Sequence, residues 1–343
     1  MGSRFLALLG ALAITVAVAS LASAPVAGQA PSAATNTTST AQRTQKWTPP
    51  RTAWGRPDLQ GIWNNATTTP LERPDKFSGK TVLSDEELSQ LTEEVGRLRN
   101  TDQAPPQGDP GTYNEFWWER GKPINQTSLI LDPPDGKLPA LTPDGQKRAD
   151  AAAANRRGRG PADSWEDRGL GERCIIYRGI PTVPTGYNNN YQIVQTPQYV
   201  GIFQEHIHET RIIPVDGRPH VGPRIRQWLG DSRGRWDGDT LVVETTNFND
   251  KALVRGFNGV VSESFRVVER FTRIDAETID YQFTVDDPKT WTRPWSGKIP
   301  MRKIQGPIFE YACHEGNYAM AGILGGHRAD ERAAEEGKKT SSR

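Results

Sequence analysis

Hydrophobic and polar residues alternate along much of the second half of this chain. Over residues 277–285, apolar side chains occupy every second position, as in a β-strand with one buried face. Similar stretches follow one another from about residue 174 without intervening helices, and Asp237–Gly238 is a strong hairpin signal. The pattern predicts a mainly β protein, whose antiparallel meander forms a calycin-like barrel or a strongly bent sheet. The expected strands lie within residues 190–197, 198–214, 224–231, 233–236, 239–248, 264–274, 277–285, 297–304 and 307–313.

A few helices are expected to decorate this sheet. At residues 85–99 the apolar side chains recur every three or four positions, and Ser84 with Glu87 can form a capping box before them. A second helix is expected to begin with Thr142 as its N-cap and Pro143 at the first helical position. A third is expected at about residues 317–335, followed by a solvated tail.

The first residues are typical of a secretory signal peptide. Arg4 precedes an apolar stretch that is followed by small residues, which predicts cleavage after Gly28, with Ala24 and Ala30 as alternative positions. An uncleaved membrane anchor is the alternative interpretation. The protein is therefore expected to be exported, to the periplasm or beyond, and its mature chain shows no other stretch of transmembrane length.

Composition divides the rest of the chain. Acidic and basic residues are interspersed and nearly equal in number, 41 against 42, which argues against a nucleic-acid partner and leaves a small-molecule ligand or substrate. The oligomeric state stays open. The expected regions are the signal peptide (1–28), a flexible linker (29–51), an extended arm with two helices packed on the barrel (52–170), the β-barrel or sheet (171–316), and a C-terminal helix with a disordered tail (317–343).

The chain has two cysteines, Cys174 and Cys313. In an exported protein an even number of cysteines favours a disulfide, and free buried thiols are the alternative. A bridge would place His314 and Glu315, which follow Cys313, beside Cys174 at the start of the barrel.

Three of the five histidines lie within residues 203–220. If residues 199–213 form one strand, His206 and His208 share a face with Gln204, while Arg211 lies on the other face. Two imidazoles on one strand face could form half of a divalent metal site, most simply for zinc, which His314 would complete.

Acid–base chemistry without a metal is the second interpretation of this segment. His208 would act as the base, oriented by Glu209, Glu244 or Asp231, and Arg211 would anchor an anionic group. The third interpretation places these polar residues on the solvent face of an ordinary sheet.

Aromatic and amide residues provide candidates for ligand binding. Trp291 and Trp295 could stack on a sugar or an aromatic ring, or pack at the rim of the barrel. Tyr187 and Asn190 belong to a polar run that forms either a turn or a ligand-binding loop. The aromatic stretch with Trp117 and Trp118 either packs the arm on the barrel or forms one wall of a cleft.

Several linked motifs resemble those of a large group of uncharacterised exported proteins of soil and other environmental bacteria. They are WGRPDLQGIW, RCIIYRGIP, YNNNYQIVQTP, HETRIIPVDGRPH, WLGDSRGRWDGDTLVVETTNF, ERFTRIDAETIDYQFTVDDPKTWTRPW and YACHEGNY, spread over residues 52–330. The resemblance implies export and a shared fold, and the group has no established activity. It implies roles for His208 and Arg211 in one motif and for His314, Glu315 and Asn317 in another. Because the corresponding motif of this group accepts other residues at the position of His206, the resemblance favours His208 and His314 as the functional pair.

These observations lead to two principal hypotheses. The first is an exported hydrolase or lyase acting on a glycoside or aromatic compound, with His208 as general base and His314 or Glu315 as its partner. The second is a non-catalytic periplasmic protein that binds a small ligand. A structural partner of an envelope complex is a weaker third. Phosphate-binding loops, dinucleotide fingerprints and haem motifs are absent from the sequence, so a divalent ion is the only cofactor considered.

Overall fold

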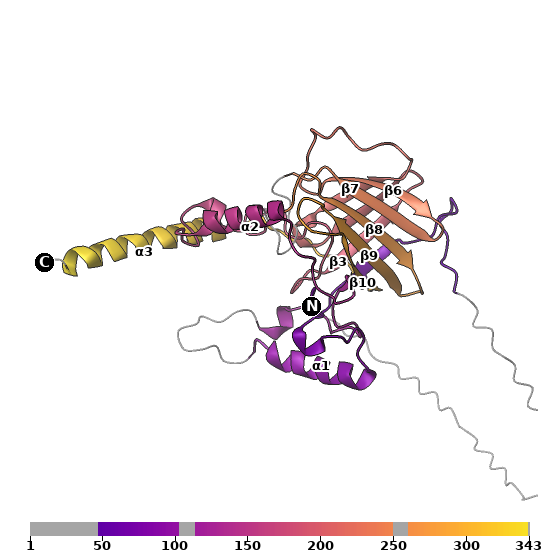
Figure 1. The fold of residues 1–343 in the computed structure, drawn as a ribbon, viewed down its shortest axis with the longest axis horizontal. Helices are drawn as coiled ribbons and strands as arrows, with labels where there is room; N and C mark the ends of the chain where they lie inside the picture. Colours follow the sequence, from indigo (N-terminus) through magenta and orange to yellow (C-terminus); the bar gives the residue numbers. More distant parts are fainter. Residues whose placement is uncertain (1–46, 103–113, 250–259, 342–343) are drawn as a thin grey trace, which may run out of the picture. The chain divides into compact units, whose positions relative to one another are not determined.

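The computed structural model describes residues 47–102, 114–249 and 260–341. The predicted signal peptide and most of the predicted linker lie outside the described residues. A ten-stranded antiparallel sheet forms the centre of the described structure (Figure 1). Its strands are β1 (Gly61–Asn64), β2 (Ile130–Asp132), β3 (Asn190–Gln195), β4 (Tyr199–Gln204), β5 (Thr210–Pro214), β6 (Asp231–Asp237), β7 (Thr240–Thr246), β8 (Arg266–Arg273), β9 (Thr278–Asp286) and β10 (Trp295–Lys303).

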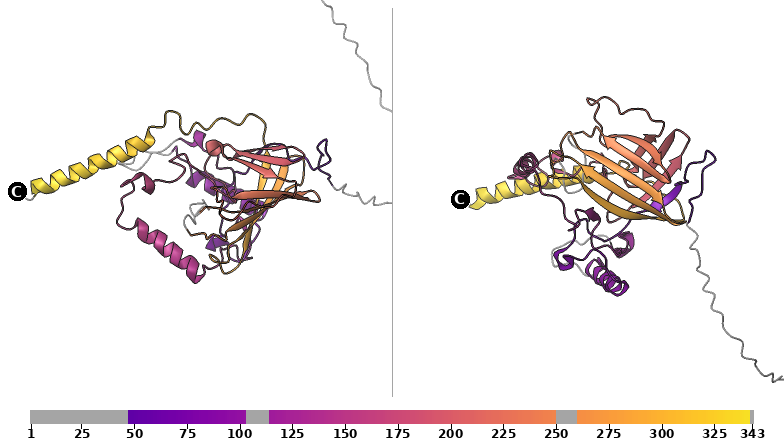
Figure 2. Two further views of the ribbon diagram at one scale, coloured as in Figure 1. Left: turned by 90° about the horizontal axis from the view of Figure 1, so that it is seen from above. Right: turned by 45° about the vertical axis from the view of Figure 1, so that its right-hand side comes forward.

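The sheet curves until it is nearly closed into a barrel (Figure 2). Its strand order is β5-β4-β3-β1-β10-β9-β8-β7-β6, with β2 paired to β10. The two end strands, β5 and β6, have no ladder between them but pack closely, since a Cβ at Gly234 would come within 2.8 Å of Val215 and 3.0 Å of Ile213. The predicted mainly antiparallel β fold with barrel-like curvature is therefore confirmed.

The hairpins follow the turn chemistry of the sequence, with exceptions. Gly238 has a φ of +58° and joins β6 to β7, as predicted. The prediction of one strand over residues 199–213 was wrong, because β4 and β5 form a hairpin around the short 3₁₀ turn His206–His208. Residues 224–230 and 307–313 are not strands either. In the second of these segments Phe309 is 70% exposed, so the segment has no buried face to stabilise a strand.

The arm contributes strands to the sheet instead of only packing on it. β1 lies between β3 and β10, and its Trp63 is completely buried. A four-residue strand with one inward side chain is too short to show a period-two pattern, which is why the sequence did not predict it.

The inner face of the barrel is filled by side chains. Phe283 packs edge-to-face on Trp295 and also contacts Tyr281, and all three are at most 2% exposed. The interior is thus a packed hydrophobic core of the kind found in small barrels. Further members of this core are Trp63, Tyr191, Ile193, Ile202, Ile213, Val243, Val267, Phe271, Ile279, Val285 and Ile299.

The helices begin where the caps predict. Ser84 and Glu87 form a complete capping box, and Thr142 accepts a hydrogen bond from the Gly145 N–H before Pro143. The third helix does not stop at residue 335 but continues to Ser341, through residues predicted as a disordered tail. No helix among the described residues is long and apolar enough to cross a membrane. The helices are α1 (Asp85–Leu98), α2 (Pro143–Arg156) and α3 (Ala319–Ser341), and the 3₁₀ turns are Asp75–Phe77, Glu115–Trp117, Trp165–Asp167 and His206–His208.

Candidate functional site at the barrel rim

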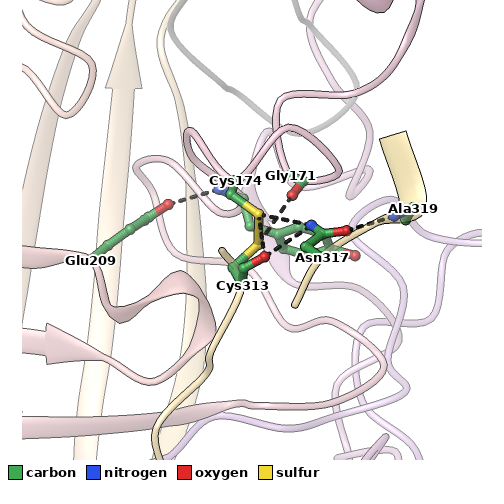
Figure 3. The surroundings of a disulfide bond; sticks show 7 residues. Gly171, Cys174, Glu209, Cys313, Asn317 and Ala319 are labelled. Atoms are coloured by element: carbon green, nitrogen blue, oxygen red, sulfur yellow. Dashed lines mark hydrogen bonds between the residues drawn. A yellow bond between two sulfur atoms is a disulfide. The ribbon is translucent and has the colours of Figure 1, made fainter. Parts of the chain in front are cut away.

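A disulfide joins Cys174 to Cys313, as predicted, and links segments 139 residues apart (Figure 3). The Asn317 side chain donates to the Cys313 carbonyl at 2.9 Å and accepts from the Ala319 N–H at 3.0 Å. Asn317 therefore stabilises the disulfide region and the start of α3. His314 is exposed in a shallow hollow that Cys174 also lines, so the bridge does hold His314 near the start of the barrel segment.

His206 lies buried where the β4–β5 hairpin turns. Its ring stacks on Tyr177 at a centroid distance of 3.7 Å, and the rings of Tyr187 and Tyr311 lie 5.1 and 4.7 Å away. Burial, reinforced by the nearby Arg178 guanidinium, lowers the pKa of His206 to about 3, so the imidazole is neutral. The rings come from the loop before β3, the β4–β5 turn and the segment of Tyr311, so this cluster packs three chain segments together at the rim of the barrel.

The backbone next to His206 is strained. Ile207 has a φ of +56°, a left-handed conformation that is unfavourable for a β-branched residue, and its side chain is 4% exposed. Neither ring nitrogen of His206 has a partner that meets strict hydrogen-bond geometry among the described residues. The Tyr187 backbone nevertheless interacts with the ring and raises the pKa of His206, an effect smaller than the lowering by burial. The side chain of His208 lies outside the described residues.

Arg178 organises the loop before β3. Its guanidinium donates to the Tyr191 hydroxyl at 2.9 Å and to the Thr185 hydroxyl at 2.8 Å, with further bonds to loop carbonyls. Glu209 accepts a hydrogen bond from the Tyr177 N–H at 2.7 Å. Both side chains are buried, so they position the rim segments and are not open to solvent.

Arg211 was predicted to anchor an anionic group, but its side chain is buried and already paired. Its side chain points into the barrel and forms a two-pronged ion pair with Glu269, at 2.5 and 3.0 Å. The Tyr281 hydroxyl donates to the same carboxylate at 3.0 Å, and burial keeps the pKa of that hydroxyl well above its usual value. The prediction treated β4 and β5 as one strand. The hairpin turn between them instead places Arg211 on the inner face, beside Ile202.

The predicted tryptophan platform is also corrected. Trp291 and Trp295 are each 2% exposed and pack edge-to-face at 5.9 Å, so their rings belong to the core and offer no face to a ligand. Asn190 bonds to Glu205 and Asn64 across neighbouring strands, which is a structural role. Tyr187 is half-buried between His206 and Trp118.

The remaining predicted site residues are not brought together in the described structure. Glu315 is exposed and lines a surface hollow with Phe309 and Phe203, apart from the aromatic cluster of His206. No contact between His206 and His314 is found among the described residues. The metal site predicted on His206, His208 and His314 stays untested.

His220 and Asp231 form a pair with a geometry suited to acid–base chemistry, which the sequence did not indicate. The Nδ1 atom of His220 lies 2.8 Å from Asp231, and its Nε2 atom lies 3.9 Å from Glu244. Asp231 is itself held by Arg233 at 2.6 Å. Both carboxylates are among the predicted partners of His208. Only the folding of the 214–231 loop onto β6 brings His220 to them, and no sequence spacing indicates it.

A cleft of about 410 Å³ lies where the arm meets the barrel rim. On the rim side it is bounded by the loop of Val183–Gly186, which Arg178 holds in place. Arg120 reaches the cleft while stacking on Trp118, at 4.0 Å from the ring, and Trp118 packs against Gly186. The lining residues are Thr67, Thr68, Thr69, Pro70, Leu71, Arg99, Arg120, Leu129, Val183, Pro184, Thr185 and Gly186.

Comparisons with protein-family models, with curated proteins and with solved structures found no match to this chain.

Proposed function

We propose that this protein is an exported small-molecule-binding protein whose ligand occupies the cleft between the arm and the barrel rim. The observation that supports this most is the cleft itself. Its volume of about 410 Å³ falls within the range of small-molecule sites, and it combines apolar walls with a few converging polar groups. The barrel interior, in contrast, is packed with side chains.

The polar groups of the cleft favour a small organic anion. Arg120 is paired with Glu115, at 2.6 and 2.8 Å, but Arg99 has no carboxylate partner among the described residues. The residues that line the cleft therefore include two arginines and no carboxylate, so the lining carries a net positive charge. Guanidinium groups bind carboxylates through charge-assisted hydrogen bonds.

The apolar part of the cleft fits the body of such an anion. Leu71, Leu129 and Val183 line it, and Leu129 and Val183 are almost fully buried, so they are held in place by the core. A carboxylic acid with a compact ring or short chain would bury its apolar surface here and direct its carboxylate to Arg99. Benzoate and hexanoate represent the two kinds of ligand.

Isothermal titration calorimetry of the mature protein with benzoate and hexanoate tests the proposal, with benzyl alcohol as the uncharged comparison. Benzoate or hexanoate should bind more tightly than benzyl alcohol. The Arg99→Gln variant should weaken anion binding by about tenfold, the loss of one charge-assisted hydrogen bond. The matched control is Arg224→Gln, an exposed arginine outside the cleft. Equal binding by both variants, or no binding of either anion, would reject this site.

An acid–base enzyme is the second candidate, and the pair of His220 with Asp231 supports it. Because Nδ1 of His220 bonds to the buried Asp231 carboxylate, its Nε2 atom, 3.9 Å from Glu244, is the one that could act as a general base. Turnover of nitrophenyl esters and glycosides by the wild type, lost in His220→Gln and retained in His314→Gln, would favour this candidate. Absence of turnover in the wild type would remove it.

A further inference from the structure

A second cluster of metal-ligating side chains lies where α3 meets the loop before η3 (Trp165–Asp167). The Nε2 atom of His327 lies 2.9 Å from Asp163 Oδ1 and 3.6 Å from Glu331 Oε1. All three donor atoms lie within 4.8 Å of one another. Two donors on one tetrahedral zinc ion are roughly 3.4 Å apart, given metal–ligand distances near 2.1 Å. The spacing of His327 and Glu331 is close to this value, and the hydrogen-bonded pair of His327 and Asp163 would have to open by about 0.5 Å to admit an ion.

The second oxygen of each carboxylate is already held by another group. Asp163 Oδ2 accepts the Gly160 N–H at 2.7 Å, and Glu331 Oε2 lies 3.1 Å from the Arg328 guanidinium. Each carboxylate is therefore oriented so that its other oxygen points to His327. Such outer contacts fix the ligands of protein metal sites.

Gly160 provides a second, independent observation. A Cβ at this position would lie 2.5 Å from Asp163 Oδ1 and 3.0 Å from His327 Nε2. A side chain at position 160 would therefore collide with both donor atoms.

We propose that Asp163, His327 and Glu331 bind one divalent transition-metal ion, with zinc as the best match to an imidazole and two carboxylates. The donor side chains are between 22% and 43% exposed, so an ion can enter from solvent. This site is separate from the metal site that the sequence predicted. Its sequence signal is His327 and Glu331 at i and i+4 on one helix face.

The ion would fasten α3 to the body of the protein. No residue of α3 is buried, so the helix contributes little packing of its own. Besides this cluster, Arg328 bonds to the carbonyls of Ala162 and Asp163, at 2.9 and 3.1 Å. A metal bridging the loop and the helix would add a third connection beside these bonds and the disulfide.

Calorimetric titration of the mature, untagged protein with zinc sulfate tests the proposal, with magnesium chloride as the comparison. Zinc should bind at one ion per chain, and both His327→Ala and Glu331→Gln should weaken it by about tenfold or more. His220→Ala is the matched control, because it removes another histidine with two neighbouring carboxylates. Glu331→Gln is a conservative change at an exposed position, so we expect this variant to fold like the wild type.

Limited trypsin digestion gives a second measurement. Zinc should slow cleavage within α3, which carries Lys338 and Lys339, and EDTA should reverse the effect. His327→Ala should abolish the protection. Zinc binding of unchanged strength in His327→Ala and Glu331→Gln, or no zinc binding by the wild type, would overturn the proposal and leave an ion-pair cluster only.

Discussion

The body of the barrel and its rim treat buried polar groups differently. In the body, Arg211 is buried against Glu269, and Tyr281 completes the bonding of that carboxylate. At the rim, His206 is equally buried, but its ring nitrogens have no partner at hydrogen-bond geometry among the described residues, and Ile207 beside it is strained. The body thus holds a buried pair of opposite charges, although Arg211 Nε and Trp295 Nε1 have no hydrogen-bond partner among the described residues. The rim instead holds a neutral imidazole beside a strained turn, next to the proposed ligand cleft.

This difference favours the rim over the barrel interior as the place where the proposed ligand binds. A filled interior cannot accept a ligand without repacking, while the rim is assembled from loops and from the arm and keeps an open cleft.

Removing the charge of Glu269 should produce the largest loss of stability. Glu269→Gln leaves the buried Arg211 guanidinium without its counter-charge, which costs about 3–5 kcal/mol. Urea denaturation of the variant measures the loss, and Glu244→Gln, at a partly exposed ion pair with Arg266, should cost less than about 1 kcal/mol. The double variant Arg211→Met with Glu269→Leu should be more stable than Glu269→Gln. Equal stability of the two single variants would contradict the account of the barrel body.

The disulfide should contribute about 2–5 kcal/mol to the stability of the rim. The change is Cys174→Ser together with Cys313→Ser, which removes the bridge without leaving a free thiol. Thermal unfolding should show a lower midpoint for the variant, and adding a reductant should lower the midpoint of the wild type alone. If reduction shifts both proteins equally, the bridge is not responsible.

The neutral His206 should make stability depend on pH. Its pKa is about 3 in the folded protein and near 6.5 when unfolded, so the unfolded chain binds the extra proton as the pH falls below 6.5. The contribution of His206 to the free energy of unfolding is therefore complete above pH 6.5. It declines on acidification, by about 2 kcal/mol at pH 5.

Urea denaturation of the wild type and of His206→Phe at pH 7.5 and pH 5 measures this term. The phenyl ring keeps the stacking on Tyr177 but cannot be protonated, so the variant should lose about 2 kcal/mol less than the wild type between the two pH values. Identical losses would show that His206 is not held neutral.

The smallest effect is expected in the arm. Ser84→Ala removes the cap of α1, which has no buried residue, and should cost about 1 kcal/mol locally. Amide hydrogen exchange should accelerate in the first turns of α1 and stay unchanged in β8 and β9. Ser89→Ala, an exposed site within the same helix, is the control. Faster exchange throughout the barrel would mean that the arm and the body unfold together.

Sequence analysis predicted the parts of the fold that follow from local rules. The alternation around Phe283, the capping box of Ser84 and the bridge between Cys174 and Cys313 each depend on short-range patterns or on a simple count. The places where it failed depend on long-range packing. Trp63 is buried in a strand too short to show a period, and the turn at Ile207 adopts a conformation that its sequence disfavours.

The candidate sites were less predictable than the fold for the same reason. His220 meets Asp231, and His327 meets Asp163, only because loops and helices from distant segments converge. The cleft at the rim depends on Arg99 and Arg120 of the arm approaching the loop of Val183–Gly186. None of these approaches leaves a spacing in the sequence that distinguishes it from ordinary surface residues.

Crystallography of the mature protein with 4-bromobenzoate would show where a small organic anion binds, because the anomalous signal of bromine locates the ligand. We expect a bromine peak in the cleft between the arm and the rim, beside Leu71 and Val183, with the carboxylate directed to Arg99. A peak within the barrel interior or at another surface, or no peak at saturating concentration, would contradict it.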